Sequence, residues 1–296
     1  MMRFTDCIRG TLTLADGAWG TELIVAGGQL TECLDAWNLT RPDQVSRVAD
    51  SYIRAGSRVI LTNTFRSNPI SLAYYGLQDQ CSTINRAGVR ISLQAAGKSV
   101  MVLGSIGPIG EPHSKGDFSR RALQRALSEQ AQALAVETPH AILIETMTDL
   151  EEARIAAEAA LATALPVVVS FVFVSESGQH RTPAGNTPQQ VASALAGDGI
   201  HAIGSNCCDL RESISICRQL ADASTLPIWI KPNAGLPTMV DGLPAYSIAP
   251  EEFAASAQQL CEAGATFLGG CCGTTPEFIR ALANQPALRS MPARDL

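Results

Sequence analysis

Cysteines are the residues of this chain whose type and spacing most clearly suggest chemistry. There are nine of them. Cys207 and Cys208 are adjacent, and Cys271 and Cys272 are adjacent within GGCCGTTP. Three cysteine thiolates around a zinc ion leave one tetrahedral position open, which is the arrangement of a catalytic site. A substrate thiol at that position is deprotonated at neutral pH and stays nucleophilic, so the cysteines suggest thiol activation by Zn²⁺.

Other interpretations of the cysteines remain open on the residues alone. Buried free cysteines are common as small apolar residues, and this suffices for the isolated ones, Cys7, Cys33, Cys81, Cys217 and Cys261. An adjacent pair could instead serve thiol redox chemistry, or hold a purely structural zinc. Adjacent strand residues point to opposite faces, so only one of Cys207 and Cys208 can face a shared site. Spacing does not choose between them.

Two carboxylates also follow apolar runs, Asp16 in LADGAWG and Glu145 in ILIETM. One or both could hold a substrate ammonium. Asp16 followed by Gly17 is equally typical of an ordinary turn. Glu145 ends a run that should be buried, and an unpaired buried carboxylate is costly, so we expect a cationic partner for it.

The elements that must position these groups are eight apolar runs bracketed by turn residues. They are rich in Val, Ile and Leu without polar alternation, which is typical of strands buried on both faces of a parallel sheet. The runs are 11–17, 57–64, 99–107, 141–147, 166–173, 202–208, 227–234 and 266–273.

Helical patterns separate the runs. In 42–54, apolar residues recur with helical periodicity, and Gly56 is placed to end the helix. Comparable patterns cover 80–97, 119–136, 150–163, 188–197, 210–222, 250–263 and 276–284. Eight strand and helix units without a composition break predict an α/β fold, a single (β/α)8 TIM barrel over residues 1–296. No G-x-G-x-x-G follows the first run, which disfavours an open dinucleotide-binding sheet.

A barrel gathers its active site at the carboxyl ends of the strands. The sixth and eighth runs end in the two cysteine pairs, and the first and fourth end in Asp16 and Glu145. All of these side chains are therefore expected on one rim, where three thiols could meet.

Composition narrows the class of partner. The chain is 46% hydrophobic and 17% charged, with a net charge of −6, as expected of a globular α/β protein. Its 22 Lys and Arg are scattered, so a nucleic-acid partner is not expected. No stretch reaches the roughly 18 apolar residues of a membrane span, and Met1 to Leu14 lacks a signal-peptide pattern. We expect a cytoplasmic protein with reduced thiols and a small-molecule substrate.

Seven motifs in the same chain resemble those of the homocysteine S-methyltransferase family, and they occur in the family's order. The resemblance runs from about residue 10 to 285. The motifs are DGAWGTEL at 16–23, ILTNTF at 60–65, GSIGP at 104–108, IET at 144–146, GSNC at 204–207, KPNAGLP at 231–237 and GGCCGTTP at 269–276. The resemblance implies a zinc-dependent transferase that methylates the thiol of homocysteine to form methionine.

Carried over motif by motif, the family's zinc ligands fall on Cys207, Cys271 and Cys272. This selects Cys207 over Cys208. The family's homocysteine-binding acids fall on Asp16 and Glu145.

Three further positions take a substrate-related role from the resemblance. Backbone groups around Gly17 and Ala18 would lie near the substrate carboxylate. Asn233 matches an asparagine that can approach the metal when substrate is absent.

Members of the family differ in their methyl donor. The donors are S-methylmethionine or S-adenosylmethionine, betaine, and a methylcorrinoid charged from methyltetrahydrofolate. Residues 33–76 most resemble the homocysteine module of cobalamin-dependent methionine synthase, and Arg66 replaces the tyrosine that follows TF in betaine-using members. Because the sequence ends soon after the last helix pattern, we expect either a methylcorrinoid supplied by a partner protein or a small sulfonium donor. A betaine-using enzyme or a cysteine-pair redox protein is the alternative.

Overall fold

Eight parallel strands form the centre of the molecule. The computed structural model describes residue 4 and residues 12–109, 118–176, 178–240 and 243–285. The sheet order is β1-β12-β9-β8-β5-β4-β3-β2, and every neighbouring pair is parallel. The strands are β1 (Thr13–Leu14), β2 (Val59–Leu61), β3 (Met101–Ile106), β4 (Ala141–Met147), β5 (Val167–Phe171), β8 (Ala202–Asn206), β9 (Ile228–Lys231) and β12 (Ala265–Leu268).

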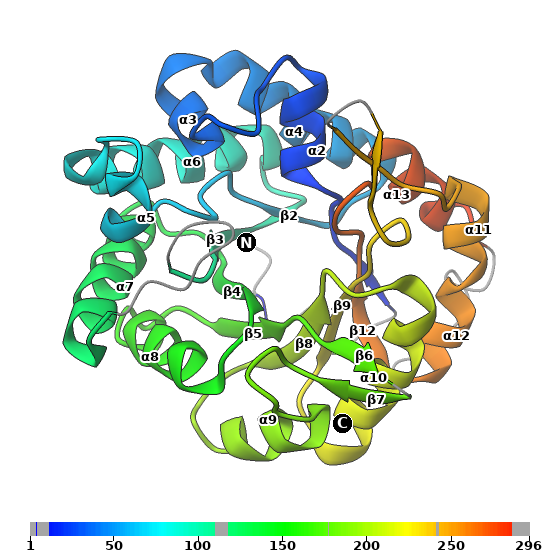
Figure 1. The fold of residues 1–296 in the computed structure, drawn as a ribbon. Helices are drawn as coiled ribbons and strands as arrows, with labels where there is room; N and C mark the ends of the chain where they lie inside the picture. The colour runs from blue at the N-terminus through cyan, green and yellow to red at the C-terminus, as the bar shows by residue number, and fades with distance from the viewer. Residues whose placement is uncertain (1–3, 5–11, 110–117, 177, 241–242, 286–296) are drawn as a thin grey trace.

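The sheet curls until β1 and β2 face each other. The Arg58 N–H donates to the Leu14 carbonyl at 2.8 Å, and the Leu61 N–H donates to the Asp16 carboxylate at 2.7 Å. Ser57 Oγ also donates to the Ala15 carbonyl at 3.3 Å, so both backbone and side-chain hydrogen bonds bridge the seam. The result is a nearly closed parallel barrel surrounded by helices (Figure 1). The prediction of a (β/α)8 barrel is confirmed, and all eight predicted runs contain a strand.

The outer helices lie where the periodicity predicts them. They are α4 (Pro42–Ala55), α6 (Cys81–Ala96), α7 (Arg120–Ala135), α8 (Leu150–Leu161), α9 (Pro188–Leu195), α10 (Leu210–Ala223), α11 (Pro250–Ala255), α12 (Ala257–Glu262) and α13 (Pro276–Ala283). The expected helix over 250–263 is divided at Ser256, whose hydroxyl donates to the Phe253 carbonyl at 2.7 Å. A serine hydroxyl competes in this way for helix carbonyls.

Additional short elements occupy the loops that follow the strands. They are α2 (Trp19–Val25), η1 (Leu34–Ala36), α3 (Trp37–Thr40), α5 (Pro69–Ala73), η2 (Gln78–Gln80), and two hairpins, β6 (Val174–Glu176) with β7 (Gln179–Arg181) and β10 (Thr238–Val240) with β11 (Leu243–Ala245). Sequence periodicity did not predict them, because segments this short carry fewer than two helical turns or strand repeats. They build the mouth of the barrel.

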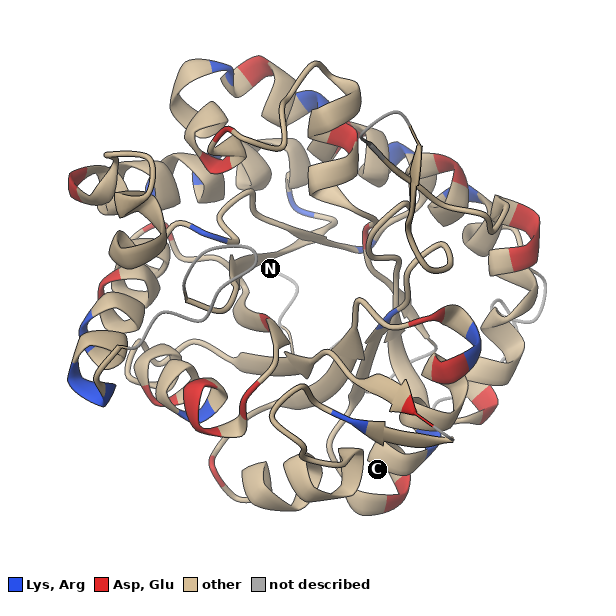
Figure 2. Ribbon diagram, in the orientation of Figure 1, with Lys and Arg blue, Asp and Glu red and all other residues tan. Residues whose placement is uncertain are grey.

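The outside of the barrel carries mixed charge. Figure 2 shows Lys and Arg interspersed with Asp and Glu on the surrounding helices. None of the helices in the described ranges has the length and apolar character needed to cross a membrane. The assignment of residues 1–296 to one domain stays a prediction.

Candidate metal and substrate site

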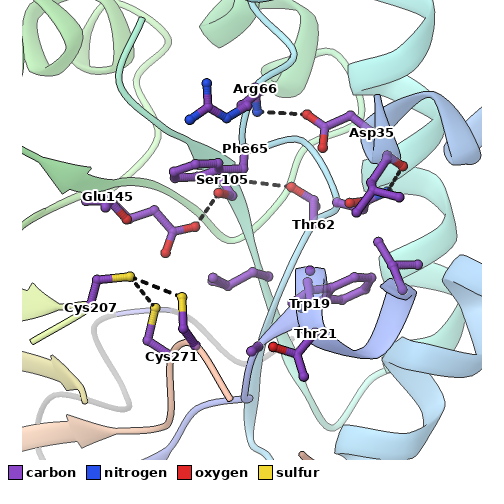
Figure 3. Close-up of a pocket in the computed structure, with 18 of the residues that line it drawn as sticks. Trp19, Thr21, Asp35, Thr62, Phe65, Arg66, Ser105, Glu145, Cys207 and Cys271 are labelled. Atoms are coloured by element: carbon purple, nitrogen blue, oxygen red, sulfur yellow. Dashed lines mark hydrogen bonds between the residues drawn. The ribbon is translucent and has the colours of Figure 1, made fainter. Parts of the chain in front are cut away.

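Three cysteines converge at the mouth of the barrel. The Sγ of Cys207 lies 2.9 Å from the Sγ of Cys271 and 3.6 Å from that of Cys272. All three sulfur atoms lie within 4.8 Å of one another, the one such group of His, Cys, Asp or Glu ligand atoms found in the described parts of the chain. Cys207 follows β8, Cys271 and Cys272 follow β12, and β9 lies between these two strands in the sheet. Figure 3 shows the sulfur atoms of Cys207 and Cys271 facing each other.

The segment after β9 holds both cysteine loops in place. The Cys207 N–H donates to the Lys231 carbonyl at 3.2 Å, and the Cys271 N–H donates to the Pro232 carbonyl at 2.6 Å. Asn233 Nδ2 donates to the Cys207 carbonyl at 3.1 Å. Residues 231–233 thus form hydrogen bonds with both cysteine loops. These backbone contacts help to fix the positions of the sulfur atoms, in addition to the contacts between the sulfur atoms.

The three thiols of the cluster differ in pKa. Hydrogen bonds from Cys207 and Cys271 lower the pKa of Cys272 to about 3. The contact with Cys207 lowers the pKa of Cys271, but the contact with Cys272 and burial outweigh it and raise that pKa to about 12. The hydrogen bonds to Cys271 and Cys272, together with burial, raise the pKa of Cys207 as well. Because three thiolates so close together would repel one another, ionisation of the whole cluster would be favoured by a bound cation.

The surroundings of the cluster fit such a cation. Buried Asn233 Oδ1 has no hydrogen-bond partner, although the same amide is fixed through Nδ2 beside Cys207. A buried acceptor without a partner is costly, and a metal ion would supply one. Tyr246 adds a hydrogen bond to Cys272 that favours its thiolate form. Three sulfurs with a nearby amide oxygen suit a thiophilic divalent metal.

Asn206 links the sulfur cluster to the acidic side of the site. Its Oδ1 accepts from the Thr146 N–H at 2.9 Å and from Ser170 Oγ at 2.7 Å, and its Nδ2 donates to Thr146 Oγ1 at 2.6 Å. Thr146 and Cys207 both have a left-handed backbone, with φ of 63° and 59°. Such a conformation costs a non-glycine residue on the order of 1 kcal/mol or more and persists where surrounding contacts fix it.

Glu145 is buried between Ser105 and the sulfur cluster (Figure 3). Ser105 Oγ donates to Glu145 Oε1 at 2.5 Å. Burial raises the pKa of this carboxyl to about 7, with Lys231 acting in the opposite direction and Cys271 adding to the rise. The expected cationic partner is thus Lys231, which acts on Glu145 electrostatically. Near neutral pH a bound cation would readily shift Glu145 to its carboxylate form.

Asp16 has a closer partner. Lys231 Nζ donates to Asp16 Oδ1 at 2.6 Å, while Trp19 Nε1 and the Leu61 N–H donate to Oδ2 at 2.6 Å and 2.7 Å. Asp16 has no exposed surface and Lys231 is 3% exposed. Burial lowers the pKa of Lys231, but Asp16 and Glu145 outweigh it and raise that pKa above its ordinary value. Lys231 is therefore a buried cation whose main counter-ion is Asp16.

A cavity of about 480 Å³ opens over these groups. Its lining residues include Cys207, Cys271, Cys272, Glu145 and Lys231. The loops after β1 and β2 also line the cavity, with Asp35, Phe65, Arg66 and Tyr75 among their residues. Asp35 accepts from the Arg66 N–H and from Ser67 Oγ, and burial raises the pKa of Asp35 to about 6. The cavity thus joins a sulfur-rich region, here called the sulfur floor, to polar groups of these loops.

The family model for homocysteine S-methyltransferase matches residues 13–285 of this chain. The chain belongs to the homocysteine S-methyltransferase family. The match covers every strand of the barrel and both cysteine loops, and the resemblance seen in the motifs is confirmed, as is the expectation of an enzyme of this family.

Similar proteins include longer ones. The chain is 29% identical over 98% of its length to a methionine synthase of Mycobacterium tuberculosis, and 30% identical over 91% to that of Mycobacterium leprae. It spans about a quarter of the length of each, 26% and 24%. Among solved structures, the oxidized and metallated forms of the Escherichia coli homocysteine methyltransferase MmuM both give a TM-score of 0.77. They share 27% and 26% identity with this chain, over 92% and 93% of its length and 95% and 96% of theirs.

Within this homocysteine S-methyltransferase family member, most of the residues singled out from the sequence lie together. The three cysteines, Glu145, Gly17 and Ala18 line the cavity. A Cβ at Gly17 would lie 2.7 Å from the Tyr52 ring, so a side chain does not fit there. Asp16 lies fully buried against Lys231, and Asn233 lies against the Cys207 carbonyl.

Other groups beside the site were not singled out from the sequence. They are Lys231, Asn206 and Tyr246, each of which contacts a predicted site residue: Asp16, Cys271 and Cys272, respectively. A usable signal existed for Lys231, which ends the buried run IWIK just as Glu145 ends ILIE. Cys208 packs away from the cluster, where its Sγ lies 3.1 Å from Ser205 Oγ and accepts from the Phe173 N–H at 3.2 Å.

Proposed function

We propose that this protein transfers a methyl group to the thiol of homocysteine, forming methionine, with Zn²⁺ bound by Cys207, Cys271 and Cys272. The observation that carries the proposal is the meeting of three sulfur atoms within 4.8 Å at the floor of a cavity that also contains Glu145. Family membership and the similarity to the E. coli homocysteine methyltransferase support the same chemistry. When bound, the zinc ion would supply the positive charge that keeps a substrate thiol ionised and nucleophilic.

The residues of this chain would orient the substrate. Glu145 would receive the substrate ammonium, because it is the buried acid at the cavity wall with no direct cationic partner at its second oxygen among the described residues. The turn at Gly17 and Ala18 would lie beside the carboxylate. Asp16 would contribute through Lys231, which it holds at the cavity wall. Asn233 would approach the metal through its unpartnered oxygen when the substrate is absent.

The methyl step itself requires little of the protein beyond alignment. A thiolate held above the sulfur floor would attack the donor methyl in line, forming the new S–C bond while the donor keeps the electron pair of the bond that breaks. Cavity walls formed by Trp19, Phe65 and Leu61 would exclude water from the reacting atoms.

Two kinds of donor fit the proposal. A methylcorrinoid charged from methyltetrahydrofolate and carried by a partner protein is favoured by the resemblance of residues 33–76 to the homocysteine module of cobalamin-dependent methionine synthase, and the chain is also similar to two proteins named methionine synthase. S-methylmethionine or S-adenosylmethionine is the small sulfonium alternative, and the near full-length match to the E. coli homocysteine methyltransferase is to a protein of similar size. Betaine ranks lower, because Arg66 stands where betaine-using members of the family have a tyrosine after the TF pair, and Arg66 lines the cavity.

A methyl-transfer assay tests this function. The purified protein is incubated with homocysteine and, separately, S-methylmethionine, S-adenosylmethionine, betaine and methylcobalamin, and methionine is quantified. Metal analysis and zinc X-ray absorption are measured in parallel, with and without homocysteine. We expect methionine from at least one donor, about one zinc per chain, and one additional sulfur neighbour at zinc when homocysteine is added. Absence of methionine with every donor, together with absence of bound zinc, would overturn the proposal.

A further inference from the structure

We propose that Lys231 recognises the carboxylate of the substrate, so that the site selects a free α-amino acid thiol. This inference deepens the proposed function and rests on it. Lys231 is the end of β9, lies at the wall of the cavity, and is assigned no role by the motif resemblance. The buried Lys231 ammonium would bind the carboxylate of an amino acid, and the Glu145 carboxylate would bind its ammonium.

The hydrogen bonds of Lys231 leave donors for a ligand. A lysine ammonium has three N–H donors, and the hydrogen bond described for Lys231 Nζ is with Asp16 Oδ1 at 2.6 Å, while the Trp229 ring centroid lies 5.9 Å from Nζ. The Lys231 side chain is 3% exposed, so bulk water satisfies little of the remaining donor capacity. A carboxylate entering the cavity can accept from these donors at short range, where a charge-assisted hydrogen bond is strongest.

Asp16 fixes this ammonium as a cation. One Asp16 oxygen binds Lys231, and the other is held by Trp19 Nε1 and the Leu61 N–H. Three donors thus lock the Asp16 rotamer, and Asp16 in turn locks Lys231. With its oxygens engaged in this way, Asp16 is poorly placed to bind a second ammonium, and Glu145 is left to do so.

The backbone turn beside Asp16 needs help to hold a carboxylate. The Ala18 N–H already donates to the Thr274 carbonyl at 3.2 Å. Lys231 Nζ is hydrogen-bonded to the side chain of Asp16, the residue before Gly17, and therefore adds a full positive charge next to the same turn. A substrate carboxylate at Gly17 and Ala18 would contact Lys231 as well.

The charges around the cavity complement one class of molecule. Glu145, Lys231 and the sulfur cluster all line it, and both Glu145 and Cys271 interact electrostatically with Lys231. An α-amino acid carries its ammonium and carboxylate on the same carbon, so an adjacent acid and base match the pair. A thiol on a short side chain of that carbon would then point to the sulfur floor. Amino acids blocked at either charged group should bind poorly.

The affinities of three thiols distinguish carboxylate recognition by Lys231 from a purely structural role of this residue. The probes are homocysteine, 3-aminopropane-1-thiol, which lacks the carboxylate, and 4-sulfanylbutanoate, which lacks the ammonium. Affinities for the zinc-loaded protein are measured by calorimetry. Wild-type protein should prefer homocysteine to 3-aminopropane-1-thiol by about 30-fold to 100-fold, the scale of a charge-assisted hydrogen bond. In the Lys231→Met variant that ratio should collapse to within a few-fold of one.

Matched variants make the result specific. Glu145→Gln should instead collapse the preference for homocysteine over 4-sulfanylbutanoate, and Lys231→Arg should keep the preference for a carboxylate. Because Lys231→Met leaves Asp16 buried without its cation, the double variant Asp16→Asn/Lys231→Met removes both charges, and it should show the same loss if the single variant does not fold. Equal weakening of all three thiols in the folded lysine variants would overturn the inference. That outcome is independent of whether any donor supports methyl transfer, so failure of the proposed function is seen separately.

Discussion

Both ends of the barrel contain titratable side chains, but these side chains have different roles at the two ends. At the carboxyl ends of the strands, buried Asp16, Glu145 and Lys231 face one another across the mouth. At the amino ends, polar groups close the strand edges, and His140 Nδ1 and His201 Nδ1 accept from the Val102 and Val167 N–H groups at 3.1 Å and 3.2 Å. The carboxyl end therefore places charged groups around a cavity, whereas the imidazoles at the amino end accept hydrogen bonds from backbone N–H groups.

Left-handed backbone shows the same division. Four non-glycine residues among those described have positive φ. Thr138 and Ala164 follow α7 and α8 at the amino end of the barrel, where a left-handed residue commonly ends a helix. Thr146 and Cys207 lie at the mouth, and the side chain of Asn206 connects them. At the mouth, side-chain contacts hold the left-handed conformation of residues in or beside the site. At the other end, the left-handed residues follow the ends of helices.

Removing one sulfur from the mouth should produce the largest functional effect with little change in stability. Cys272→Ser replaces the most acidic thiol of the cluster. We expect methyl transfer to fall by at least about 10³-fold, as for loss of an essential group at a metal centre, and zinc content to fall with it. Cys261→Ser, outside the cluster, is the matched control. Full zinc occupancy and full activity in Cys272→Ser would remove the sulfur cluster from the mechanism.

Truncating a buried aromatic side chain that takes no part in the sulfur cluster should reverse the pattern. Phe4 is buried and stacks on Phe267 with ring centroids 5.5 Å apart. Phe4→Ala should lower the free energy of unfolding by about 3 kcal/mol, the usual scale for truncating a buried phenylalanine. Denaturant unfolding measures this, with zinc content and KM for homocysteine measured beside it. A loss of zinc binding in a variant that stays folded would contradict the division between the ends.

The pH dependence of substrate capture should report Glu145. Its pKa is raised to about 7, mainly by burial. Below pH 7 the neutral acid cannot attract an ammonium, so kcat/KM for homocysteine should fall as pH decreases, approaching tenfold per pH unit. Glu145→Gln should remove this limb and lower kcat/KM about 30-fold at pH 8, with Glu151→Gln on the outer surface as control. An unchanged acidic limb in Glu145→Gln would assign it to another group.

Sequence patterns predicted the framework of both ends better than the contacts across the mouth. Eight buried parallel strands were recognisable because each is a continuous apolar run, and the cysteines and Glu145 were placed because they end such runs. The pairing of Lys231 with Asp16 joins residues 215 positions apart and leaves no periodic trace. Asn206 is similar, since its partners Thr146 and Ser170 lie 60 and 36 positions away. Such contacts depend on which strand ends face one another after the barrel closes.

The histidines at the amino end should give the smallest effect, and one confined to stability. Burial lowers the pKa of His140 and of His201 from their ordinary values. The unfolded chain then takes up protons first, so these residues stabilise the fold above pH 6.5 and lose that contribution as pH falls below it. Replacing both with Asn, whose amide oxygen can accept the same N–H without titrating, should remove this loss, so that the Tm of the variant falls less, or rises more, than that of wild type as pH decreases from 7 to 5. The comparison is made against wild type, because buried Asp35 and Glu145 titrate in the opposite direction and are common to both proteins. Identical slopes in the two proteins would show that these imidazoles do not sense pH, while a change in KM for homocysteine would show that the two ends are not independent.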